Sequence, residues 1–131
     1  MSFPLWCLFI AALMLVLTKM PVAVAMHQLG SKGYDNRNPR RQQAELSGWG
    51  SRAMAAHANM FEAFPLFAAA VLVTQVTNLH GSTVDLLAGL FIGSRIAYTA
   101  FYLLDWHAVR SLTWGIGFIS CLVMLVLPAL A

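Results

Sequence analysis

Three residues with polar or charged side chains, Arg52, Asn59 and Glu62, follow one another at spacings of seven and three at the start of an apolar region. At about 100° per residue these spacings place all three on one stripe of a helix, whereas His57 points elsewhere. Arg offers hydrogen-bond donors, Asn offers donors and an acceptor, and an ionised Glu offers acceptors. The stripe therefore suits a polar ligand with charges of both signs, and it equally suits a polar network that only holds helices together.

A second stripe of polar side chains has spacings of three, four and three, and consists of Arg95, Tyr98, Tyr102 and Asp105. Two such stripes on neighbouring helices predict a shared cavity. The tyrosine hydroxyls either donate to a ligand there or find partners inside a bundle. Asp105 lies at the boundary of the apolar segment, where water can solvate it.

Arg110 follows at the start of the last apolar segment. It is either an anchor at the membrane interface or a charge beside a bound thiol, in which case it lowers the thiol pKa from its usual value of about 8.5. No phosphate-binding Gly-rich loop or Ser nucleophile motif is present, and the four His residues are scattered. We therefore expect no metal site.

The elements that position these residues are predicted to cross a membrane. Hydrophobic residues make up 60% of the 131 positions and charged residues only 10%. Stretches long enough to span a bilayer lie at about 4–25, 46–76, 84–104 and 110–130. The first is a retained helix rather than a signal peptide, because no positive charge precedes it. The fold class is therefore all-α, a single membrane-embedded four-helix domain over residues 1–131.

Positive charges concentrate in and beside the first connection and are missing from residues 77–83; the basic residues there are Lys32, Arg37, Arg40, Arg41 and Arg52. This predicts cytoplasmic first and third connections, with both termini on the other side. The net charge of +3 needs no nucleic-acid partner. Residues 28–43 are predicted to be non-helical, and Glu45–Gly50 to begin the second helix at the interface. The basic run at 37–41 either binds anionic lipid headgroups or lines a site for an anionic ligand.

One segment resembles a known family. Arg52-Ala53 followed by Asn59-Met60-Phe61-Glu62-Ala63-Phe64-Pro65-Leu66-Phe67 is similar to the second-helix motif of the MAPEG family, the membrane-associated proteins in eicosanoid and glutathione metabolism. The resemblance extends to Tyr98, Tyr102 and Arg110 and to the four-helix topology of the whole chain.

The resemblance implies a homotrimer in lipid, here a bacterial inner membrane, with active sites between subunits near the cytoplasm. It implies glutathione as a co-substrate, whose thiol is activated against lipophilic electrophiles or hydroperoxides. The implied roles are a thiolate stabiliser, Arg110, and a set of glutathione contacts, namely Arg37, Arg52, His57, Asn59, Glu62, Tyr98 and Tyr102. Glutathione-using relatives usually have an arginine four residues before the Asn, where this chain has Ala55.

Three functions are consistent with these patterns. The first is a glutathione transferase or peroxidase. The second is a non-catalytic membrane scaffold of the same fold, which Ala55 favours. The third is a small multidrug exporter with Glu62 as its proton-coupled carboxylate, although such proteins typically carry this acid in their first helix, and the first helix here has none.

Overall fold

The computed structural model describes all 131 residues, and every regular element in it is a helix. In chain order the elements are α1 (Phe3–Leu17), α2 (Lys19–Leu29), α3 (Pro39–Ala44), α4 (Gly48–Val76), α5 (Ser82–Leu103) and α6 (His107–Leu130). The pair α1–α2, and each of α4, α5 and α6, is long and apolar enough to cross a membrane. The predicted all-α membrane four-helix bundle is confirmed. The expected and observed bounds of the four spans differ most at the end of the first span, which was expected near Ala25 and lies at Leu29.

The first span is divided in two by a short break at Thr18. Pro21 has no N–H to donate to the carbonyl of Leu17, and its ring crowds that carbonyl, so regular hydrogen bonding is interrupted one turn before the proline. The Thr18 backbone N–H and its Oγ1 both donate to Met14 O, the latter at 2.8 Å. The side chain of Thr18 thus adds a second hydrogen bond to the carbonyl that already accepts from its backbone N–H, at the end of α1.

The connection between α2 and α4 is more ordered than the sequence suggested. Helix α2 continues to Leu29, and α3 forms within the segment expected to be non-helical. The buried side chain of Gln42 closes the loop, because its Nε2 donates to Gly33 O at 3.0 Å and its Oε1 accepts from the Asp35 N–H at 2.8 Å. The helix start expected within Glu45–Gly50 lies at Gly48, where α4 begins, while Glu45 caps the end of α3.

The two other connections use the same turn. At the end of α4, Asn78 adopts φ 53°, and the Leu79 N–H donates to Thr74 O. At the end of α5, Asp105 adopts φ 60°, and the Trp106 N–H donates to Phe101 O. Both are Schellman motifs, in which a left-handed residue ends a helix and lets the last carbonyls be satisfied. Asp105 is therefore outside α5, and its predicted place on the polar face of that helix is wrong.

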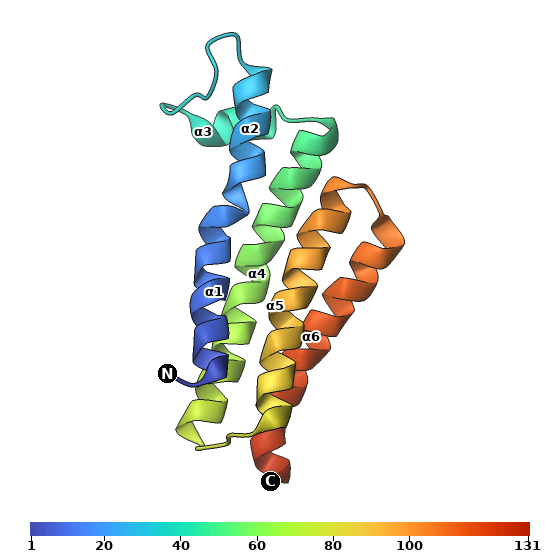
Figure 1. Cartoon of the computed structure of the whole chain (residues 1–131). Coiled ribbons are helices and arrows are strands. Elements are labelled where there is room, and N and C mark those ends of the chain that lie inside the picture. Colours follow the sequence, from blue (N-terminus) through green and yellow to red (C-terminus); the bar gives the residue numbers. More distant parts are fainter.

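Helices α4 and α5 lie at the centre of the bundle, since α1 and α6 each pack against both of them. Phe67 of α4 stacks on Phe91 of α5 with ring centroids 3.9 Å apart, within a core of mainly apolar residues. Figure 1 shows the first and third connections at one end of the bundle, and both termini with the second connection at the other. This arrangement brings the upper half of α5 between the polar residues of α4 and the start of α6.

Candidate functional site

The polar stripe of α4 contains a direct hydrogen bond between two of its residues. Asn59 Nδ2 donates to Glu62 Oε2 at 2.8 Å, as residues three apart on a helix are neighbours. Glu62 lies at the midpoint of α4 and is exposed in the single chain, while Asn59 is half-buried. At about 1.5 Å per residue α4 is about 43 Å long, which exceeds the roughly 30 Å of a hydrocarbon core. A carboxylate so far from both helix ends is expected to face a wet cavity or another protein surface.

Arg95 of α5 hydrogen-bonds to the same Asn59 side chain. Its Nη2 donates to Asn59 Oδ1 at 2.7 Å, and only 2% of the residue is exposed. Its Nε is buried and has no hydrogen-bond partner. The sequence placed Arg95 on the same face as Tyr98 but gave it no role, because the pairing with Asn59 depends on the register between two helices.

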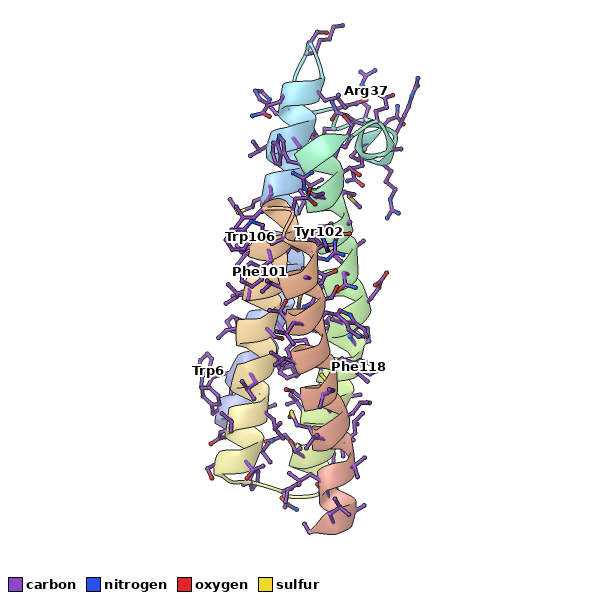
Figure 2. The ribbon with its side chains drawn as sticks, turned by 90° about the vertical axis from the view of Figure 1, so that its right-hand side faces the viewer. Trp6, Arg37, Phe101, Tyr102, Trp106 and Phe118 are labelled. Atoms are coloured by element: carbon purple, nitrogen blue, oxygen red, sulfur yellow. The ribbon has the colours of Figure 1, made fainter.

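From Arg95, aromatic contacts continue toward the end of α5. The guanidinium carbon of Arg95 lies 4.3 Å from the centroid of the Tyr98 ring, and the Tyr98 and Tyr102 rings meet edge to face at 5.6 Å. The guanidinium carbon of Arg110, in the first turn of α6, lies 4.2 Å from the Tyr102 centroid. Both arginines are within the range of cation–π attraction. Figure 2 shows Tyr102 close to Phe101 and Trp106, whose stacked rings pack at the α5–α6 turn that positions Arg110.

These contacts link residues of α4, α5 and α6 in one continuous series. We call this series the polar network, and its residues are Glu62, Asn59, Arg95, Tyr98, Tyr102 and Arg110. Its two ends are a carboxylate and a guanidinium.

A cavity of about 160 Å³ adjoins the carboxylate end of the polar network. Asn59, Glu62 and Arg95 form its polar wall. The other wall is mainly apolar and consists of Ala63, Leu66, Phe91, Trp114, Phe118 and Cys121. Trp114 and Phe118 stack on each other with centroids 5.0 Å apart, and Figure 2 shows Phe118 on α6 well below the turn. A cavity with one charged and one aromatic wall suits a ligand that is polar at one end and apolar at the other.

Comparison with known protein families identifies the family of the chain. The statistical model of the MAPEG family matches residues 3–130. The chain belongs to the MAPEG family. No curated protein and no solved structure matches it. Because the match includes all four membrane-long helices, the whole bundle is an integral membrane protein of the family associated with eicosanoid and glutathione metabolism.

Within this MAPEG chain, Arg37 and Arg52 lie apart from the polar network. Arg37 is exposed in the first connection, and its N–H donates to Asp35 Oδ1 at 3.0 Å. Figure 2 shows Arg37 beyond the end of α5 that carries Tyr102. Arg52 is half-buried near the start of α4, and its Nε has no partner. Their assignment as glutathione contacts stays a prediction.

His57 faces the first span rather than the polar network. Its Nδ1 lies 2.8 Å from Thr18 Oγ1, and its ring meets Phe61 edge to face. Because the single proton of the Thr18 hydroxyl is donated to Met14 O, the proton between the two side chains belongs to His57 Nδ1. Within this chain, His57 thus ties α4 to the break between α1 and α2, and its assignment as a glutathione contact stays a prediction.

Proposed function

We propose that the protein is a membrane-bound glutathione transferase or peroxidase that acts on lipophilic electrophiles or hydroperoxides. The observation that carries the proposal is the polar network, which connects a carboxylate at the midpoint of α4 to a guanidinium at the α5–α6 end of the bundle. Glutathione has an ammonium group, two carboxylates and a thiol, so its charges match groups of both signs along this path.

The dimensions of the network support a ligand of this size. Arg95 and Tyr102 are seven residues apart on α5, which is about 10 Å at 1.5 Å per residue. A fully extended tripeptide also spans about 10 Å. One glutathione molecule is therefore long enough to lie along Tyr98 and Tyr102, with its amino group directed toward Glu62 and its central cysteine directed toward Arg110.

In the proposed reaction, Arg110 stabilises the thiolate and the thiol proton leaves to water. A permanently charged guanidinium favours the ionised thiol and so supplies a nucleophile at neutral pH. In a transfer, the sulfur lone pair forms a bond to an electrophilic carbon of the second substrate. Either a leaving group departs with the electrons of its bond to that carbon, or, in an addition, the π electrons of a double bond move to the neighbouring atom, which takes a proton from water. In a peroxidase reaction, two glutathione thiols together supply two electrons, and the hydroperoxide becomes an alcohol and water while the disulfide forms. The lipophilic substrate would enter from the membrane at the Arg110 end of the polar network, beside the stacked rings of Phe101 and Trp106.

The same proposal includes a homotrimer in a bacterial inner membrane, with the first and third connections in the cytoplasm. Arg37 and His57 lie away from the polar network of their own chain, and we propose that they reach glutathione bound beside a neighbouring subunit. Arg52, whose buried Nε has no partner within the chain, is the candidate for a glutathione carboxylate. The clustering of basic residues in the first connection supports this orientation.

The proposal is tested by titrating glutathione into the detergent-solubilised protein in a calorimeter while recording the ultraviolet absorbance of the thiolate. Arg110→Ala should still bind glutathione but lose the thiolate absorbance, and its rate with a lipophilic electrophile should fall by a factor of about 10² or more. Arg41→Ala, a change at an exposed side chain of α3, is the matched control and should behave as the wild type. An unchanged rate in Arg110→Ala would overturn the assignment of Arg110.

A non-catalytic scaffold is the second candidate, and Ala55 is the observation that favours it. Absence of glutathione binding by the wild-type protein would support this candidate over the enzyme. Proton-driven efflux from vesicles that depends on Glu62 would instead support the exporter.

A further inference from the structure

We propose that Arg95 is a positioning residue which, through the Asn59 amide, holds the Glu62 carboxylate in the orientation that receives an ammonium group. The inference deepens the proposed function and rests on it, because it assumes that Glu62 receives the amino group of glutathione. It is carried by the two consecutive hydrogen bonds that run from Arg95 through Asn59 to Glu62.

The amide of Asn59 has only one orientation that satisfies both neighbours. A guanidinium has donors and no acceptor, so it must face the amide oxygen, whereas an ionised carboxylate must face the amide nitrogen. A rotation of the amide by half a turn would bring two donors together at Arg95 and two acceptors together at Glu62. Arg95 therefore determines which way the amide points, and the amide in turn holds Glu62 Oε2 at 2.8 Å.

The position of Asn59 between the two charges also keeps the carboxylate available. Arg95 and Glu62 form no ion pair; the single ion pair of the chain joins Arg41 and Glu45. A direct bidentate pair would occupy both carboxylate oxygens. With the neutral amide in between, Glu62 makes one hydrogen bond within the chain through Oε2, and its other oxygen has no hydrogen-bond partner in the chain.

The buried position of Arg95 gives this arrangement its rigidity. The Arg95 side chain is buried, with its guanidinium over the Tyr98 ring at 4.3 Å and one of its nitrogens bonded to Asn59 of α4. A charged group in such a place has few alternative orientations, so it constrains Asn59 more strongly than a solvated residue would. We therefore expect loss of Arg95 to free both Asn59 and Glu62.

The experiment compares two ligands that differ only in the group that Glu62 would receive. Calorimetry gives the affinities for glutathione and for des-amino glutathione, in which the amino group is replaced by hydrogen. Wild-type protein should prefer glutathione by about 10-fold or more, the range expected for one hydrogen-bonded charge. Arg95→Met should lower the affinity for glutathione until the preference disappears, while the affinity for des-amino glutathione stays within about two-fold of the wild type.

Three further variants show whether Arg95 acts through Asn59. Asn59→Leu should abolish the preference as Arg95→Met does, and the combined variant should lose nothing more, since both changes break the same connection. Arg95→Lys keeps a charged donor and should retain part of the preference. Arg41→Met is the surface control. If Arg95→Met does not fold, the affinities of Asn59→Leu and Arg95→Lys for the two ligands test the inference. It is supported if the preference for glutathione disappears in Asn59→Leu and is partly retained in Arg95→Lys.

Each remaining outcome overturns the inference in a different way. Equal losses of affinity for both ligands in Arg95→Met would mean that Arg95 acts on the fold or contacts another part of glutathione. Equal wild-type affinities for the two ligands would mean that Glu62 does not receive the amino group. Failure of the wild type to bind either ligand would defeat the proposed function itself, and the inference with it.

Discussion

At the scale of single residues, the polar side chains of α4 have two separate sets of partners. Asn59 and Glu62 belong to the polar network, whereas His57, although close in sequence, bonds to Thr18. The helical period predicted this division from sequence, because it places His57 off the stripe. The partners themselves were not predictable, since both Thr18 and Arg95 are brought to α4 by tertiary packing.

The bond between Thr18 and His57 should stabilise the bundle. Thr18→Val keeps the shape of the side chain but removes the hydroxyl, so the His57 Nδ1–H loses its partner, at an expected cost of about 1 kcal/mol in the free energy of unfolding. Thermal or denaturant unfolding in detergent measures this cost. In a double-mutant cycle with His57→Leu, the coupling should be about 0.5–1.5 kcal/mol.

Thr77→Val is the control for this cycle. Thr77 also follows a helix and bonds to the carbonyl four residues earlier, at 2.8 Å, but both hydrogen bonds of its hydroxyl are to carbonyls of α4 itself. Its loss should show no coupling to His57→Leu. A Thr18 coupling as small as that of Thr77 would contradict the proposed tie between α4 and the first span.

At the scale of helices, the hydrophobic spans located every membrane-long element, whereas local hydrogen bonding decided where the elements end. Asp105 continued the polar periodicity of α5, yet the Schellman turn places it outside the helix. Residues 28–43 contain Gly, Asn and Pro, which favour a loop. The short helix α3 forms within them because Gln42 and Pro39 support it, and such side-chain bonds leave no periodic signal in the sequence.

The contact between α5 and α6 depends on the absence of a side chain at Gly117. A Cβ there would lie 2.5 Å from Ser94 Oγ, which donates to Phe91 O at 2.7 Å. Gly117→Ala should force Ser94 out of this hydrogen bond or separate the helices. Gly115, two residues earlier on α6, has nothing within 4 Å of the same position. We expect Gly117→Ala to be less stable than Gly115→Ala by about 1 kcal/mol in thermal unfolding.

Ser94→Ala should rescue this defect. It removes the atom that the new methyl group meets, so Gly117→Ala combined with Ser94→Ala should recover most of the difference from Gly115→Ala. Equal stability of the two single glycine variants would show that the packing of α5 against α6 does not depend on the absence of a side chain at Gly117.

At the scale of the whole molecule, the single chain leaves the Glu62 carboxylate of the polar network exposed. Glu62 is exposed at the midpoint of α4, and the outward surface around it is largely apolar, as expected for a chain that membrane lipid surrounds. An ionised carboxylate facing hydrocarbon is costly. Either a water-filled cavity or another subunit must therefore cover this side of α4, and a homotrimer of the proposed kind would supply both.

The assembly makes a specific prediction for the chemistry of Glu62. Native mass spectrometry of the protein released from mild detergent should give a species of three chains. An apolar carbodiimide, which modifies carboxyl groups within membranes, should then react slowly with Glu62 in the trimer. It should react quickly once a harsh detergent separates the subunits, because the carboxyl group becomes accessible from the apolar phase.

Glu45, which is exposed on the single chain outside the apolar segments, should react with a water-soluble carbodiimide equally well in both states. A single-chain species in mild detergent with rapidly modified Glu62 would mean that no neighbouring subunit covers the polar network, and the site would have to function within one chain.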